Sequence, residues 1–211
     1  NYYGTDPNLS FVEKLNYYGF RSENLGKADI KGIDLGITGA GKIGPVNLTL
    51  FNGYTYINPI KPDYNPSIDT LGLEGLNVLK YRNRHLFKND IQLDYKIFSI
   101  GYSVRYQSKI ENIDNRFVRP LFDELGNGFD SDDAPTILPG LKKNFDQYQK
   151  DVWIHDLRFS IQVSKQLRIS YIVNNFTNVE YQARPGDMRA PTLHVFQLNF
   201  RPVYADKKTE N

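Results

Sequence analysis

The densest group of potential metal ligands in the chain is an acidic stretch in its second half. Asp130, Asp132 and Asp133 follow closely on Asp123 and Glu124. Carboxylate oxygens are the ligands that calcium prefers, but an EF-hand loop also needs a glutamate at its closing position, which this stretch lacks. The spacing therefore supports only a weak calcium candidate, and we favour a solvated loop.

Three arginines are the candidates for capturing an anionic ligand. Arg119, Arg184 and Arg189 lie in stretches that show no regular periodicity. A guanidinium group binds a carboxylate or another oxyanion through two parallel hydrogen bonds. The alternative, which we favour, is that these side chains serve solubility and surface contacts.

The other residue types that perform chemistry are scattered. His85, His155 and His194 fall in three separate segments without the spacing of metal ligands. The sequence contains neither a nucleophile motif nor a phosphate-binding glycine loop. We therefore expect no enzymatic activity and no cofactor.

The segments that position these residues have the pattern of β-strands. From Phe98 to Gln107 every second residue is apolar, and the residues between them are polar or glycine. Successive side chains of a strand point to opposite faces, so this segment has one apolar and one polar face.

The same alternation recurs in seven segments, and their connections alternate between short turns and long loops. The segments are 17–38, 46–56, 85–95, 98–107, 153–163, 167–173 and 192–200. Outer-membrane barrels have short periplasmic turns, longer extracellular loops, and strands that alternate lipid-facing with lumen-facing residues. We therefore predict an all-β fold, an antiparallel transmembrane β-barrel segment of about seven strands. Four charged residues are predicted to face the lumen: Asp34, Arg105, Asp156 and Arg158.

The composition agrees with membrane strands rather than membrane helices. Hydrophobic residues make up 40% of the 211 residues, and no apolar run reaches the roughly 18 residues of a spanning helix. Five of the 15 tyrosines lie where strands meet loops, as an interfacial aromatic girdle requires: Tyr54, Tyr56, Tyr81, Tyr106 and Tyr181. Cysteine is absent, and a formal net charge of +2 gives no reason to expect nucleic acid as a partner. A soluble all-β domain with one polar-faced sheet is the less favoured alternative.

Seven strands cannot close a barrel alone. Single-chain barrels normally have an even number of strands, and an open edge leaves backbone groups unpaired in lipid. The chain also begins at Asn1 without a signal sequence. We therefore expect a processed chain or a fragment. In this interpretation 1–16 form a loop or an incomplete strand, 17–200 the C-terminal strands of a larger barrel, and 201–211 a hydrophilic periplasmic tail.

Four segments resemble strands of the TonB-dependent outer-membrane transporters. They are Asn24–Asp34 (NLGKADIKGID), Tyr54–Tyr56 (YTY), Tyr81–His85 (YRNRH) and Val173–Tyr181 (VNNFTNVEY). The last is similar to the family's V-x-N-L-F-N-x-x-Y segment and is the most specific match. A terminal strand that ends at Phe200 completes the pattern, so the resemblance covers most of the chain.

The resemblance implies the C-terminal part of a 22-stranded barrel in the outer membrane of a Gram-negative bacterium. The implied function is TonB-dependent uptake of a scarce nutrient: a ferric siderophore, haem, cobalamin or an oligosaccharide. The implied partners are outer-membrane lipid, the remaining barrel, its plug, and TonB acting through that plug. Phe196, Leu198 and Phe200 would serve as the barrel-assembly signal. The plug and the TonB-contacting box do not lie within these 211 residues, and the tail after Phe200 is a departure from the family.

Two further alternatives stay open. The barrel could be a structural scaffold in an outer-membrane complex, with its long loops docking a surface lipoprotein lid. A small independent barrel of eight strands would need another strand within 1–16, and the pattern shows none there.

Overall fold

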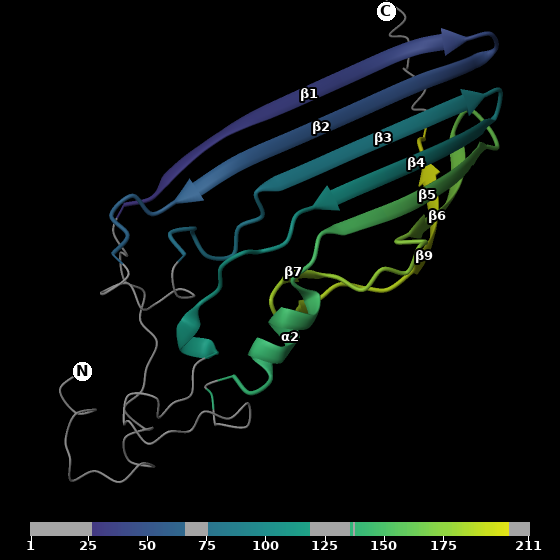
Figure 1. Cartoon of the computed structure of the whole chain (residues 1–211). Coiled ribbons are helices and arrows are strands. Elements are labelled where there is room, and N and C mark those ends of the chain that lie inside the picture. The colour runs from purple at the N-terminus through teal and green to yellow at the C-terminus, as the bar shows by residue number, and fades with distance from the viewer. Residues whose placement is uncertain (1–26, 66–75, 119–135, 137, 203–211) are drawn as a thin grey trace, which may run out of the picture.

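The computed structural model describes residues 27–65, 76–118, 136 and 138–202. In this part of the chain, seven antiparallel strands form one sheet in the order β1-β2-β3-β4-β5-β6-β9 (Figure 1). Their bounds are β1 Asp29–Ile43, β2 Val46–Ile60, β3 His85–Tyr95, β4 Phe98–Gln107, β5 Val152–Gln162, β6 Leu167–Asn174 and β9 Leu193–Phe200. The predicted all-β segment of seven consecutive antiparallel strands is confirmed.

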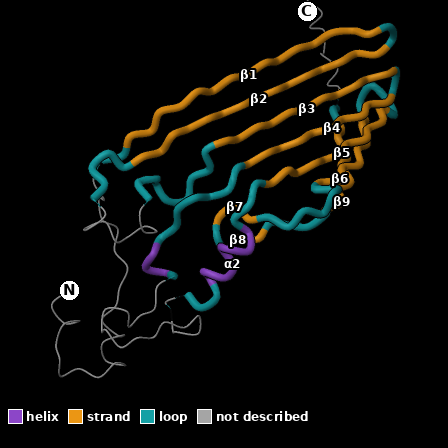
Figure 2. Tube along the Cα trace, viewed as in Figure 1, coloured by secondary structure: helices purple, strands orange, loops and turns teal. Residues whose placement is uncertain are grey.

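The sheet is curved and is not closed within the described residues. Figure 2 shows the short connections together at one end of the strands and the longer connections at the other. We call these ends the turn side and the loop side. The edge strands β1 and β9 each have only one strand neighbour in this part of the chain.

The register keeps one apolar and one polar face continuous across the sheet. On the apolar face Tyr54 lies opposite Phe87, Phe87 opposite Tyr106, and Tyr106 opposite Trp153. On the polar face Lys88 lies opposite Arg105. Because side chains alternate along a strand, a slip of one residue in any pair would exchange these two faces.

Two polar residues that interrupt the apolar face are partners of each other. Asn52 and Asn89 lie directly opposite in the β2–β3 pair. The Asn89 side-chain amide donates a hydrogen bond to the Asn52 side-chain oxygen. Each amide therefore offsets part of the cost of placing the other on an apolar surface.

The first hairpin is longer than predicted. The prediction that the first strand ends at residue 38 is wrong, because Ala40–Ile43 continue β1 and pair with Val46–Thr49. Only Gly44 and Pro45 form the turn, and Gly44 has the positive φ of 57° that glycine adopts most easily. A glycine-rich sequence indicates a turn. The backbone groups of glycine nevertheless form the hydrogen bonds between β1 and β2 as well as those of any other residue.

Two segments predicted to be irregular contain short elements on the loop side. The 310 helix η2 (Asn115–Phe117) and the helix α2 (Leu141–Tyr148) lie between β4 and β5. The strands β7 (Gln182–Arg184) and β8 (Asp187–Met188) form a small hairpin between β6 and β9. None of the described helices is long and apolar enough to cross a membrane.

The best-buried apolar side chains lie on the loop side rather than in the middle of the sheet. They are Val78, Ile113, Phe145, Val152 and Ile154. Phe145 is the buried residue of α2, and Val152 and Ile154 begin β5. This packing holds the loop-side elements against the strand ends.

Candidate functional site

Charged side chains of three neighbouring strands contact each other on the polar face. Arg105 on β4 lies with Nη2 3.1 Å from Oδ2 of Asp156 on β5. Arg158 on β5 lies with Nη2 3.4 Å from Oδ1 of Asp90 on β3. The Ser103 hydroxyl also donates a hydrogen bond to Asp90. The polar face is therefore cross-linked by ion pairs across β3, β4 and β5.

The Arg158 side chain on β5 crosses β4 to reach β3, because the β4 residue beneath it is a glycine. Gly101 on β4 is the backbone partner of Arg158. A Cβ atom added to Gly101 would lie 2.6 Å from Nη2 of that arginine. The open space above Gly101 lets the guanidinium reach Gln92 on β3, whose Oε1 is 3.2 Å away.

The four charged residues predicted for this face do not form one cluster. Asp156 belongs to the network and also accepts a hydrogen bond of 2.7 Å from the Asn175 backbone N–H. Asp34 accepts a hydrogen bond of 2.9 Å from the Thr55 hydroxyl on β2. It therefore lies on the same face as Arg105 and Arg158, but with a separate partner.

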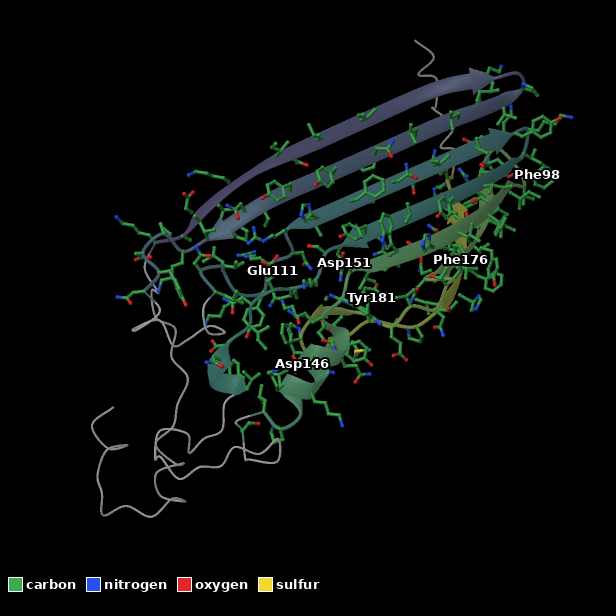
Figure 3. The ribbon with its side chains drawn as sticks, in the orientation of Figure 1. Phe98, Glu111, Asp146, Asp151, Phe176 and Tyr181 are labelled. Atoms are coloured by element: carbon green, nitrogen blue, oxygen red, sulfur yellow. The ribbon has the colours of Figure 1, made fainter. Side chains whose placement is uncertain are left out.

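A cavity of about 580 Å³ lies over the polar face, between the sheet and the chain that returns from β6. Figure 3 shows Tyr181 on the returning segment, between the sheet and α2. The Lys88 ammonium lies 5.8 Å from the centre of the Phe51 ring. The polar and aromatic residues of the lining include Asp34, Phe51, Lys88, Arg105, Tyr181 and Arg189. Three cationic groups and one carboxylate therefore lie around this space.

The structure separates the predicted ligand-binding arginines. Arg189 lines the cavity of about 580 Å³ and has an ion pair of 3.4 Å with Asp187. Arg184 lines a different cavity of about 410 Å³, together with Tyr81 and Arg82. Burial raises the pKa of the Tyr81 phenol, whose oxygen accepts a hydrogen bond from the Asp114 backbone N–H.

Several predicted residues lie outside the described part of the chain. These are Arg119, the weak calcium candidates Asp130, Asp132 and Asp133, the segments 1–16 and 17–26, and the tail from 203 to 211. Among the described residues, no group of three histidine, cysteine or acidic side chains could hold a metal ion.

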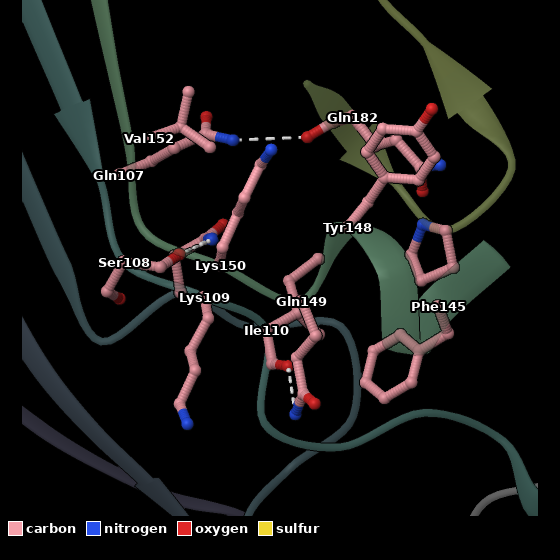
Figure 4. Close-up of a pocket in the computed structure, with 12 residues that line it drawn as sticks. Gln107, Ser108, Lys109, Ile110, Phe145, Tyr148, Gln149, Lys150, Val152 and Gln182 are labelled. Atoms are coloured by element: carbon pink, nitrogen blue, oxygen red, sulfur yellow. Dashed lines mark hydrogen bonds between the residues drawn. The ribbon is translucent and has the colours of Figure 1, made fainter. Parts of the chain in front are cut away.

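The loop-side elements meet around a void of about 20 Å³, which is the size of a single water molecule (Figure 4). The Gln107 side-chain amide donates to the Gln182 carbonyl at 3.1 Å. The Gln149 amide donates to the Ile110 carbonyl at 3.3 Å, and the Gln182 amide donates to the Asn144 side chain at 2.7 Å. This void is too small for a nutrient, and its hydrogen bonds join α2 and β7 to the end of β4.

The structure explains why segment 173–181 contains asparagines at the end of β6. Asn175 and Asn178 have positive φ angles of 49° and 53°, a conformation that asparagine tolerates better than most residues. The Asn175 side chain is bonded to both the N–H and the C=O of Val179, at 3.0 and 2.9 Å. The Thr192 hydroxyl donates to the Asn175 carbonyl at 2.8 Å. This turn therefore ties the end of β6 to the start of β9.

Comparison with known proteins identifies the family. The family model described as "TonB dependent receptor-like, beta-barrel" matches residues 1–176. The chain belongs to this family. The predicted relation to TonB-dependent transporters is thereby confirmed, and the sheet is a segment of an outer-membrane β-barrel of the receptor and transport type.

Solved TonB-dependent receptors show the same fold. The ferric-catecholate import receptor Fiu from E. coli K12, in its closed form, is 16% identical with a TM-score of 0.54, over 82% of this chain and 21% of that chain. FpvA from P. aeruginosa, in complex with a heterologous pyoverdine and iron, is 17% identical with a TM-score of 0.50, over 82% and 19%. The receptor barrel segment thus spans about a fifth of the length of these structures. A search of curated protein sequences gives no match.

Proposed function

We propose that this chain supplies the C-terminal barrel wall of a receptor that takes up a ferric siderophore across the outer membrane of a Gram-negative bacterium. The observation that supports this substrate class is the cavity of about 580 Å³ over the polar face. Lys88, Arg105 and Arg189 give its lining cationic groups, and Phe51 and Tyr181 give it aromatic surface. Anionic chelates with aromatic rings fit this combination of charge and surface.

The proposed orientation follows from the two faces. The apolar face meets lipid, because charged side chains at the centre of a lipid-facing surface would cost roughly 2–4 kcal/mol each. The polar face lines the lumen, where Asp34, Arg105, Asp156 and Arg158 contact the plug or the passing ligand. The turn side is periplasmic and the loop side is extracellular. Phe196, Leu198 and Phe200, which are all exposed on β9, act as the assembly signal.

The decisive experiment measures uptake by bacteria that make the full-length receptor. The probe is a radiolabelled ferric tris-catecholate, with haem, cobalamin and a maltodextrin supplied in parallel. The variant K88E/R189E reverses two charges at the cavity and is expected to lower ferric-catecholate uptake at least tenfold, because the anionic chelate loses two cationic partners. K165E, a charge reversal in the β5–β6 turn, is the matched control. Unchanged ferric-catecholate uptake by K88E/R189E, at equal surface amounts, would overturn the substrate assignment.

The same cells separate transport from scaffolding. Energy for uptake would reach the receptor from TonB through its plug, so deleting TonB should abolish uptake of the substrate. A scaffold that docks a lipoprotein lid would instead show no dependence on TonB for any of the four probes.

A further inference from the structure

All three histidines of the chain lie on the apolar face, and each shares a hydrogen bond with a tyrosine of a neighbouring strand in the sheet. The phenol oxygen and the imidazole Nδ1 are 2.7–2.9 Å apart in the pairs Tyr54–His85, Tyr102–His155 and Tyr171–His194. In each pair the two rings are stacked, with centroids 6.0–6.2 Å apart. We call these the three Tyr–His pairs. One arrangement repeated in three strand pairs makes chance placement of the histidines a poor explanation.

The register explains why the arrangement repeats. His85 lies opposite Tyr56, and its bonded tyrosine, Tyr54, is two residues further along the same face. His155 lies opposite Val104, with Tyr102 in the same diagonal position. Diagonal neighbours on one face of an antiparallel pair are within reach of aromatic side chains.

The chemistry of the pairs favours one position for the imidazole proton. A phenol with a reference pKa of about 10 is a good donor, and neutral imidazole is a good acceptor. A tyrosine O–H that donates to Nδ1 places the histidine proton on Nε2, and the phosphate contact proposed below requires this tautomer. Nε2 takes part in no hydrogen bond among the described residues, so each pair leaves one N–H donor directed away from its tyrosine.

The His85 pair lies at the loop-side boundary of the apolar surface, whereas on β5 the apolar surface continues past His155 to Trp153. β3, β5 and β9 begin at His85, Val152 and Leu193, so each histidine lies near the loop side. On β1 and β2 the apolar pair Ile33–Tyr56 is followed, towards the loop side, by the polar pair Lys31–Asn58. The Lys31 side chain is 80% exposed. The apolar surface therefore ends at the level of the His85 pair, where lipid headgroups begin.

We propose that the three Tyr–His pairs bind phosphate groups of outer-leaflet lipid through their Nε2–H donors. Phosphate oxygens are strong acceptors, so they complement N–H donors in a zone of limited water. The tyrosine contributes by holding the ring and its tautomer, and the histidine makes the contact. This inference rests on the proposed orientation, in which the apolar face meets lipid.

The test is solid-state NMR of the full-length receptor, labelled with ¹⁵N-histidine, in bilayers of lipid A and phosphatidylglycerol. The single variants H85Q, H155Q and H194Q assign the three signals. The expected result is a proton on Nε2 and dephasing of the Nε2 signal by ³¹P. A second sample, in maltoside micelles with inorganic phosphate, is expected to show no dephasing.

Tyrosine variants test the tautomer argument. In Y54F/Y102F/Y171F the rings lose their Nδ1 partner, so a mixture of tautomers and at least a twofold loss of dephasing are expected. Y106F is the matched control, because the Tyr106 hydroxyl donates to Asp151 rather than to a histidine. Heat-modifiable migration on gels shows that each variant has folded.

Other outcomes overturn the inference in distinguishable ways. Deuterated acyl chains report independently whether the Tyr102 ring lies in lipid. Lipid contact at Tyr102 without ³¹P dephasing at Nε2 would overturn the phosphate contact alone. Loss of both contacts would overturn the proposed orientation as well. Equal dephasing by free phosphate in micelles, or an unchanged tautomer in the triple variant, would also contradict the inference.

Discussion

At the scale of single residues, asparagine has two distinct structural functions in this chain. Asn52 and Asn89 satisfy each other across two strands on the apolar face. Asn175 and Asn178 instead adopt positive φ angles and close a turn. Asn175 is only 3% exposed, so its amide has little water available as a substitute partner.

Replacing Asn175 with alanine is therefore expected to destabilise the barrel. The change leaves the Val179 N–H and C=O without their partner and places alanine at a positive φ. We expect a loss of about 1–3 kcal/mol in the free energy of unfolding, the usual cost of unsatisfied buried polar groups. Urea unfolding of the full-length receptor in detergent micelles measures this loss. Asn174→Ala is the control, since the Asn174 side chain makes no hydrogen bond within the described residues; equal stability of the two variants would contradict the prediction.

At the scale of elements, β3, β4 and β5 are coupled on the polar face by a side chain that crosses the central strand. Arg158 reaches Asp90 over Gly101. A β-carbon at Gly101 would displace the far end of a flexible side chain rather than the backbone. The cost of that substitution should therefore depend on Arg158.

A double-mutant cycle tests this coupling. Gly101→Val is expected to lower stability, and much less so when Arg158 has already been changed to alanine. Residues in direct contact usually show coupling energies of about 0.5–3 kcal/mol. Gly36→Val is the control, because a Cβ added there meets no atom within 4 Å. Purely additive effects of the changes at Gly101 and Arg158 would show that the crossing contact contributes no stability.

Among the elements, the strands were more predictable from sequence than the end of β1 or the helix α2. The strands were predictable because a period of two is a direct consequence of strand geometry. The end of β1 was not, because Gly39 and Gly41 carry no side chain to show which backbone groups pair. Helix α2 was missed because it is short and buries only Phe145.

The candidate site was less predictable than the fold. The charged residues of the polar face follow from alternation, but their partners depend on register, which sequence does not state. Arg184 and Arg189 are close in sequence yet line different cavities, because Arg184 ends β7 and Arg189 follows β8, after the chain has reversed direction. The Tyr–His pairs were missed because each joins two strands diagonally. A signal was available, since each histidine lies two residues before an apolar residue near the start of a strand.

At the scale of the whole molecule, the alternation of short and long connections makes topology testable with two cysteines. Every strand reverses direction, so all turns must lie on one side of the membrane and all long loops on the other. Lys143 on α2 is exposed on the loop side, and Lys165 is exposed in the β5–β6 turn. This chain contains no cysteine, so each introduced thiol is unique within it.

The proposed orientation gives opposite results for these two positions. K143C should react with a membrane-impermeant maleimide on intact cells. K165C should react only after the outer membrane is permeabilised, because the sheet and lipid separate its turn from the medium. The receptor without introduced cysteines is the control for labelling elsewhere. Reaction of both positions on intact cells would exclude a sheet that spans the membrane. Reaction of K165C alone on intact cells would show that the sheet has the opposite orientation. Either result would also remove the basis for placing the Tyr–His pairs at the outer leaflet.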